Sequence, residues 1–318
     1  MKKVKAKQVT IAKKAPHTSP SSMSMFLCCR RKAYFHLVRR ITIKEPKLSL
    51  SLGKLWHAGL ETWYTTKDQA TAVRAIQKGV MDEAATGFSA FNTPATIAYY
   101  RAMLTGMLLG YIEKFGKKDL TTWKWKEAES EFELPNFFNT GITFRGTIDG
   151  IIEIPKGPNK GLWVVEHKTT KDLAYYTVEG IKQNIQTLAY LHAARQLFKI
   201  QLKGIIWNAV RKPSKRLKKQ QTIEDYCKEI KEDYLARPDF YFYRQQLIIN
   251  SANVEAWTKD VKHIMHDMEC CFNHSTSLPH WYKNTAVCDM FGGCEFIPIC
   301  TRGERRSTML LYKDITHV

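Results

Sequence analysis

The spacing of hydrophobic residues changes character about one third of the way along the chain. In the first third, apolar and aromatic residues recur every three or four positions, which predicts helices over residues 21–38, 51–64, 71–85 and 94–115. Further on, apolar residues alternate with polar ones or form short runs, which predicts strands over residues 125–134, 143–154 and 162–169. Residues 155–161 hold two prolines and two glycines and predict a hairpin loop between the last two strands.

A helix over residues 178–198 and a strand over 204–210 follow, which completes a β-β-β-α-β core. The pattern then predicts a basic loop, a helix over 223–235, a strand over 240–249 and a helix over 253–272. We therefore expect an α/β (α+β) fold in which helices flank a mixed sheet, preceded by a helical amino-terminal region.

Three charged residues interrupt the apolar strands. Asp149 lies within the strand over 143–154, whereas Glu166 and Lys168 lie two residues apart in the next strand. Alternate side chains leave a strand on the same face, so Glu166 and Lys168 project together and Asp149 can join them. Two carboxylates and an ammonium suit metal-assisted phosphodiester hydrolysis. The alternative is that these are ordinary surface residues of a turn and an edge strand.

Polar residues on two predicted helices extend this set. Gly53 and His57 lie in the helix over 51–64, and Gln186 and Tyr190 are four residues apart in the helix over 178–198. Residues four apart share one helix face, so the glutamine and the phenol can together orient a water, the lysine or a phosphate.

The cysteines give a second signal. Cys288, Cys294 and Cys300 are each separated by five residues, and a fourth thiol is available far upstream in residues 24–35. Four thiolates suit a [4Fe–4S] cluster or structural zinc, and the missing C-x-x-C pairs favour the cluster over zinc. The amino terminus has no apolar signal segment, so we expect a cytoplasmic protein and no disulfides. The other cysteines lie in predicted helices without metal-ligand spacing and are interpreted as buried or free thiols: Cys227, Cys270 and Cys271.

The chain carries 49 Lys and Arg against 30 Asp and Glu, a formal charge of +19, which indicates a polyanionic partner. We predict a basic flexible tail over residues 1–20. Candidate nucleic-acid contacts lie in two other basic segments, although a solvated loop is an equal explanation for the second segment: Arg30, Arg31, Lys32, Arg211, Lys212, Lys215 and Arg216.

The order of motifs, G-x-x-x-H, G-x-x-D, E-x-K and Q-x-x-x-Y, resembles the PD-(D/E)xK nuclease superfamily, and most closely its RecB-like branch. The cysteine arrangement is similar to that of its iron–sulfur members, such as AddB, the CRISPR-associated RecB-like exonucleases and phage relatives. Ile148 stands where the family often has proline. The resemblance implies a restriction-endonuclease-like core, with an iron–sulfur module joining the two ends of the chain.

The resemblance also implies residue roles. Metal ligands for Mg²⁺ or Mn²⁺ would be His57, Asp149, Glu166 and the backbone carbonyl of His167. Lys168 would be catalytic, with Gln186 and Tyr190 in support. The cluster ligands would be Cys29 (with Cys28 in reserve), Cys288, Cys294 and Cys300.

The expected function is therefore a metal-dependent DNA nuclease, more an exonuclease on single-stranded ends than an endonuclease, in recombination, repair, phage replication or CRISPR-type processing. A helicase, recombinase or CRISPR protein is the expected partner, inside a bacterial or phage-infected cell. The alternatives are a DNA-binding or assembly protein with little catalysis and a zinc-stabilised endonuclease. We expect a helical region over residues 21–122, a nuclease core over 123–280 and a cysteine segment over 281–318.

Overall fold

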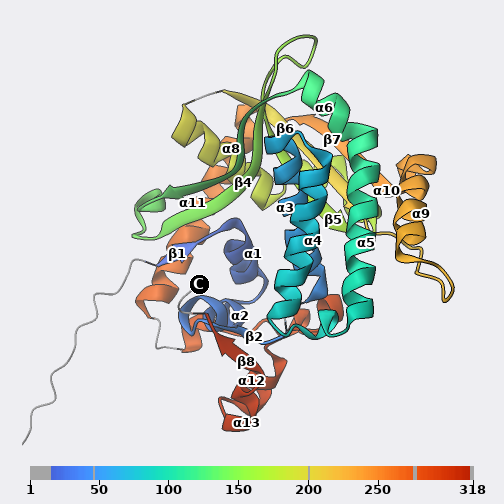
Figure 1. Cartoon of the computed structure of the whole chain (residues 1–318). Helices are drawn as coiled ribbons and strands as arrows, with labels where there is room; N and C mark the ends of the chain where they lie inside the picture. Colours follow the sequence, from blue (N-terminus) through green and yellow to red (C-terminus); the bar gives the residue numbers. More distant parts are fainter. Residues whose placement is uncertain (1–15, 46, 200, 275–277, 316–318) are drawn as a thin grey trace, which may run out of the picture.

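A six-stranded sheet with helices on both faces forms the centre of the molecule (Figure 1). The computed structural model describes residues 16–45, 47–199, 201–274 and 278–315. The strands of the sheet are β1 (His17–Thr18), β3 (Lys124–Leu134), β4 (Thr143–Ile154), β5 (Gly161–Thr170), β6 (Leu202–Arg211) and β7 (Phe242–Ile248). The predicted strands of the core are thus confirmed, and the sheet is mixed as expected.

The order of pairing explains why the sheet is mixed. Strands β3, β4 and β5 pair antiparallel, β5 pairs parallel with β6, and β7 returns antiparallel to β6. A parallel pair needs a crossover connection, and helix α8 (Ile185–Phe198) provides it between β5 and β6. This crossover places α8 beside the middle of the sheet.

One face of the sheet is covered by α8, by α1 (Pro20–Cys28) and by α11 (Ser251–Asn273) (Figure 1). Alternate strand residues such as Ile148, Val164 and Ile205 point into this core. Each is buried, and together with the apolar stripe of each helix they remove a large hydrophobic surface from water.

The opposite face is covered by α3 (Leu48–Thr66), α4 (Gln69–Ala85), α5 (Pro94–Tyr111) and α9 (Ile223–Ala236). Helices α5 and α9 approach closely because Gly106 lacks a side chain. A Cβ atom there would lie 2.6 Å from the carbonyl oxygen of Cys227. After α5, a π-helical turn at Ile112–Gly116 and helix α6 (Lys117–Thr122) lead into β3.

Two predicted helices are broken. The segment 21–38 divides at Cys29, whose φ of −159° and ψ of 112° are extended, into α1, α2 (Arg30–Ala33) and a π-helical turn at Tyr34–Val38. The segment 178–198 divides into α7 (Val178–Lys182) and α8, because the side chain of Asn184 caps α8 by accepting the Gln186 N–H at 2.9 Å. The predicted strand over 240–249 begins later, at Phe242, since α10 (Pro238–Tyr241) precedes it.

A second, two-stranded sheet was not predicted. Strand β2 (Ile41–Ile43) pairs antiparallel with β8 (Tyr312–Asp314), and so joins the two ends of the described chain. Each strand is only three residues long, which leaves no period for a sequence pattern to reveal. Helices α12 (Ile297–Arg302) and α13 (Arg306–Met309) precede β8 at the lower end of Figure 1.

The predicted division into domains remains a prediction, and the helices from residues 21–122 contribute to both cores. The predicted basic tail covers residues 1–20, and its residues 1–15 lie outside the described residues. Two residues near the end of the predicted tail, His17 and Thr18, form β1 against β4. None of the helices in the described part of the chain combines the length and the hydropathy needed to cross a bilayer.

Candidate active site

Asp149 in β4 and the Glu166 and Lys168 pair in β5 meet at the centre of the sheet. The Oδ2 atom of Asp149 accepts the backbone N–H of His167 at 2.7 Å, and the Lys168 ammonium forms an ion pair with Glu166. Asp149 is 8% exposed and Glu166 only 1% exposed. Burial at this level excludes the explanation of ordinary surface residues, since unpaired charges are costly away from water.

His57 reaches the same place from α3, on the opposite side from α8. Its Nδ1 atom lies 3.5 Å from Oδ1 of Asp149 and 3.4 Å from Oε1 of Glu129. One ligand atom from each of His57, Glu129 and Asp149 falls within 4.8 Å of the others. Imidazole nitrogen and carboxylate oxygens form a donor set that suits Mn²⁺, and the two carboxylates also suit Mg²⁺, so these residues fit a divalent metal.

Glu166 does not belong to this three-residue group, because its carboxylate is turned to Lys168. Its Oε2 atom nevertheless has no hydrogen-bond partner among the residues that the structure describes. A buried oxygen without a partner is expensive, and a cation beside it would remove that cost. The roles of Glu166 and of the His167 carbonyl as metal ligands remain predictions.

Glu129 was missed by the sequence reasoning. It lies in β3 opposite Asp149, between the paired residues Ala128 and Ser130, and its φ of 45° is in the left-handed region. A glutamate in this conformation is strained, and such strain is often kept at functional sites. A signal did exist, since glutamates occupy every second position of this strand: Glu127, Glu129, Glu131 and Glu133.

Charge and burial shift the acid–base properties of the site. Burial works against the charged form of His57, but hydrogen bonds to Asp149 and Glu129 raise its pKa to about 10. Burial and the neighbouring Asp149 charge raise the pKa of Glu166 to about 7. Burial opposes the charge of Lys168, yet Glu166 and Asp149 raise its pKa above the ordinary value. Lys168 is therefore an ammonium at neutral pH.

The Q-x-x-x-Y motif supports the lysine. Lys168 donates to Oε1 of Gln186 at 2.7 Å, and Nε2 of Gln186 donates to the hydroxyl of Tyr190 at 2.8 Å. Because the cap at Asn184 fixes the first turn of α8, Gln186 faces the sheet from the start of the helix. The prediction that this pair shares one helix face and can orient the lysine agrees with these contacts.

A buried polar network lies behind the site. Nδ2 of Asn208 bonds Nδ1 of His167 at 2.8 Å and donates to the hydroxyl of Tyr111 at 2.6 Å. Arg244 donates to the same hydroxyl at 2.8 Å and to Asp119 at 2.7 Å. Burial lowers the pKa of His167 to about 3, so this ring is neutral. The network holds the β5 and β6 backbones in place behind the acids.

A pocket of about 650 Å³ opens over the site. Its wall includes His57, Glu129 and Lys168, together with Gly53 and Lys54 of α3. The catalytic candidates are therefore reachable from solvent although Asp149 and Glu166 are buried.

The four predicted cluster cysteines lie at one end of the molecule, and two of them contact Asn284. Among the described residues, no three of their sulfur atoms fall within 4.8 Å of one another. The backbone N–H of Asn284 lies 3.4 Å from Sγ of Cys29, and its carbonyl lies 3.9 Å from Sγ of Cys288. Cys294 donates its N–H to the Cys288 carbonyl at 2.7 Å. Burial raises the pKa of Cys300; Lys283 and Arg31 oppose this shift, whereas the neighbouring thiols Cys294 and Cys29 add to it.

Cys28 is exposed, whereas Cys29 is half-buried and points to the other thiols. The choice of Cys29 over Cys28 as a cluster ligand remains a prediction.

Most of the predicted nucleic-acid contacts have partners within the chain. Arg30 pairs with Asp267 at 2.5 Å, Arg31 donates to the Trp281 carbonyl at 2.7 Å, and Lys32 pairs with Glu295 at 3.1 Å. These three cations thus join α2 to the carboxyl-terminal part of the chain.

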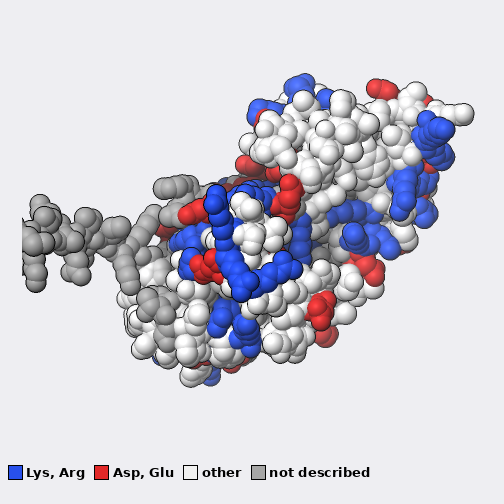
Figure 2. All heavy atoms as spheres, turned by 90° about the horizontal axis from the view of Figure 1, so that it is seen from below, with Lys and Arg blue, Asp and Glu red and all other residues white. Residues whose placement is uncertain are grey.

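In the second basic segment, Arg211 donates to the Lys171 carbonyl and Lys215 pairs with Glu229, both at 3.0 Å. The backbone of Lys212 bonds Thr170, while Arg216 is exposed. Figure 2 shows Lys and Arg side chains gathered at the centre of the lower face and toward its right-hand side, with fewer acidic side chains. Electrostatic attraction of a nucleic acid would therefore come from this wider basic surface more than from the seven predicted residues.

The comparisons agree with the geometry. No curated protein matches the chain significantly. The family model described as the PD-(D/E)XK nuclease superfamily matches residues 17–301, which include every strand of the main sheet and all the site residues above. The chain therefore belongs to the PD-(D/E)XK nuclease superfamily.

Proposed function

We propose that this protein is a metal-dependent deoxyribonuclease that acts as an exonuclease on single-stranded DNA ends. The observation that carries the proposal is the convergence of Asp149, Glu166 and Lys168 with His57 and Glu129 beneath one solvent-accessible pocket.

The residues divide into metal ligands and a charged orienting group. His57, Glu129 and Asp149 would hold Mg²⁺ or Mn²⁺, with Glu166 adjacent. The bound cation supplies Lewis-acid polarisation of the scissile phosphate. Lys168, held between Glu166 and Gln186, positions the attacking water and offsets the growing negative charge at the phosphate. Because the ammonium is held between the Glu166 carboxylate and the Gln186 amide oxygen, we assign Lys168 this electrostatic role.

Substrate class follows from charge and access. The excess of 19 positive charges favours a polyanion, and counterion release makes the binding sensitive to salt. No residue pattern reads base edges, so we expect little sequence specificity. We also propose that the protein works with a helicase, recombinase or CRISPR protein, as the resemblance implies.

Cleavage of single-stranded DNA with Mn²⁺, with Mg²⁺ and with EDTA tests the activity. Asp149→Asn and Lys168→Met keep the side-chain size and should abolish cleavage, whereas Lys160→Met, in the exposed turn before β5, should cleave like the wild type. Equal degradation by all the variants would identify a contaminant. DNA binding without metal-dependent cleavage by the wild type would instead support the assembly-protein alternative.

A matched pair of linear and circular single strands tests the mode of action. An exonuclease degrades the linear strand and leaves the circle intact, because the circle has no end. Comparable cleavage of both molecules would contradict the exonuclease proposal and leave the nuclease proposal standing.

We propose further that Cys29, Cys288, Cys294 and Cys300 hold a [4Fe–4S] cluster, with zinc as the competing occupant. The contacts of Cys29 and Cys288 with Asn284, and the electrostatic influence of Cys294 and Cys29 on Cys300, support a shared centre that ties the two ends of the chain together. Iron in anaerobically purified protein would support the cluster, whereas zinc that is present in the wild type and lost in Cys29→Ser would support the competing occupant. Cys29→Ser should lose the metal, and the exposed neighbour Cys28→Ser should keep it. Loss in Cys28→Ser alone would reverse the assignment.

A further inference from the structure

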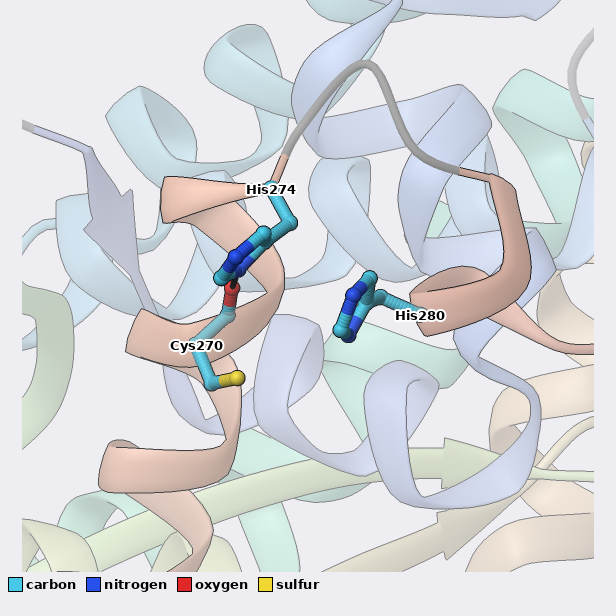
Figure 3. Close-up of side chains that lie close together, drawn as sticks. All are labelled: Cys270, His274 and His280. Atoms are coloured by element: carbon cyan, nitrogen blue, oxygen red, sulfur yellow. Dashed lines mark hydrogen bonds between the residues drawn. The ribbon is translucent and has the colours of Figure 1, made fainter.

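A separate group of metal-ligand side chains lies at the carboxyl-terminal end of α11. Cys270 and His274 come from the last turns of this region, and His280 comes from the 3₁₀ turn at Leu278–Trp281 (Figure 3). One ligand atom from each of the three lies within 4.8 Å of the others. The sequence interpretation of Cys270 as a thiol without metal-ligand spacing overlooked the histidine four residues later.

The end of α11 places Cys270 and His274 together and orients the ring of His274. Cys270 and His274 are four residues apart, so they share one face of the helix end. Nδ1 of His274 lies 2.9 Å from the Cys270 carbonyl oxygen, the contact drawn as a dashed line in Figure 3. Because a carbonyl only accepts, Nδ1 is the donor in this contact, which leaves Nε2 as the ring nitrogen that can bind a metal. Such a bond to the second ring nitrogen is the usual way in which proteins orient a metal-binding histidine.

His280 is brought to the same point by its backbone. Its ring stacks on that of His274, with 4.4 Å between ring centroids and 21° between the ring planes. The thiol of Cys271 donates to the His280 carbonyl at 3.3 Å, and Arg31 donates to the next carbonyl, that of Trp281, at 2.7 Å. The backbone at and just after His280 is thus tied to α11 and α2.

We propose that Cys270, His274 and His280 bind one Zn²⁺ ion, with solvent in the fourth position. A thiolate and two neutral imidazoles form a borderline-soft donor set, which selects zinc over the hard cations Mg²⁺ and Ca²⁺. Zn–S and Zn–N bonds of about 2.3 and 2.0 Å in a tetrahedral site place the ligand atoms about 3.3–3.5 Å apart. The three ligand atoms, which lie within 4.8 Å of one another, must therefore sit well inside that distance when the ion is bound. Cys270 and His274 are exposed, so the ion can enter without unfolding the helix.

The ion would cross-link two segments of the chain. It joins the end of α11 to the 3₁₀ turn that leads, through Asn284, to the cysteines around Cys29. A zinc ion that binds only the folded protein raises the free energy of unfolding. The increase grows with the logarithm of the ratio between the free zinc concentration and the dissociation constant. This site is independent of the proposed nuclease centre and shares no ligand with the four cysteines.

The test measures the reactivity of one thiol. The wild-type protein is alkylated with iodoacetamide with and without Zn²⁺, and the modified peptides are resolved by mass spectrometry. Zinc should slow alkylation of Cys270 in the wild type, because the metal-bound thiolate is protected. In His274→Ala and in His280→Ala, the zinc concentration that gives half-maximal protection of Cys270 should rise by at least about 10- to 100-fold. This is the loss of affinity that already follows when a group supporting a metal ligand is removed.

The matched control is His263→Ala, which removes an exposed histidine two turns earlier on α11 and should retain full protection. Because the readout follows the Cys270 peptide, zinc taken up by the four-cysteine centre does not affect it. Equal alkylation of wild-type Cys270 with and without excess Zn²⁺ would overturn the proposal without reference to any variant. Protection that survives both histidine substitutions would overturn the ligand assignment.

Discussion

Glu129 of β3 and Asp149 of β4 approach the same atom, Nδ1 of His57, at 3.4 and 3.5 Å from neighbouring strands. Without a metal, the two carboxylates share one positive charge, because the burial of His57 is overcome by their hydrogen bonds, which raise its pKa to about 10. A metal ion that binds Nδ1 would displace this proton. A divalent metal ion would bind at the same place, between the two carboxylates. The left-handed backbone of Glu129 directs it there at a cost in strain.

Glu129→Gln should therefore weaken metal binding. The substitution keeps the side-chain volume and removes one anionic ligand, and we expect the Mn²⁺ concentration for half-maximal cleavage to rise about 10- to 100-fold. Titration of activity against Mn²⁺ measures the change. Glu131→Gln, exposed two residues along the same strand, is the control and should leave the titration unchanged. Identical curves for the two variants would remove Glu129 from the metal site.

Gln186 should act through Lys168 and not through the metal. Gln186→Leu removes the acceptor of the 2.7 Å bond from Lys168, and a loss of about 10- to 100-fold in kcat is expected from a displaced ammonium. The metal titration midpoint should stay unchanged, which separates this variant from Glu129→Gln. Tyr190→Phe removes only the bond to Gln186 and should cost about fivefold. Gln196→Ala, exposed on the same helix, is the control.

The Asp119–Arg244 pair should matter for stability. The side chains of Asp119 and Arg244 are 5% and 16% exposed, and the 2.7 Å bond between them neutralises two buried charges. Asp119→Ala leaves the guanidinium buried without its partner, and we expect a loss of about 3–5 kcal/mol in the free energy of unfolding. Urea unfolding followed by circular dichroism measures it. Asp82→Ala breaks an exposed pair with Lys78 on α4 and should have no measurable effect.

Asp233 should give a pH-dependent contribution to stability. Burial opposes its charge, but hydrogen bonds from Arg237 and Tyr241 lower its pKa below the ordinary 3.8. A lowered folded-state pKa gives stability that is present above pH 3.8 and is lost as the pH falls through the folded-state value.

Asp233→Asn should therefore lower the urea midpoint at neutral pH, and the gap to the wild type should narrow below pH 3.8. The comparison is run against Asp260→Asn, an exposed site on α11. A gap that stays constant on acidification would show that the Asp233 charge does not stabilise the fold.

The sequence by itself determined the strands and the motif residues. Short apolar segments around Asp149 and before Glu166 mark β4 and β5, because an apolar segment of strand length fits a strand buried in a sheet. The four-residue spacing of Gln186 and Tyr190 likewise follows from helix geometry alone. Local geometry is encoded locally, so these parts of the site could be read from the chain.

Only the tertiary structure decided which distant residues meet. The register of β3 against β4 sets Glu129 opposite Asp149, and the approach of the Leu278–Trp281 turn to α11 brings His280 to His274. The short strands β2 and β8 pair across almost the whole described chain, and Arg30 finds Asp267 instead of solvent. These contacts depend on the packing of segments far apart in sequence, whose energies are summed over the whole fold and leave no periodic trace in any one segment.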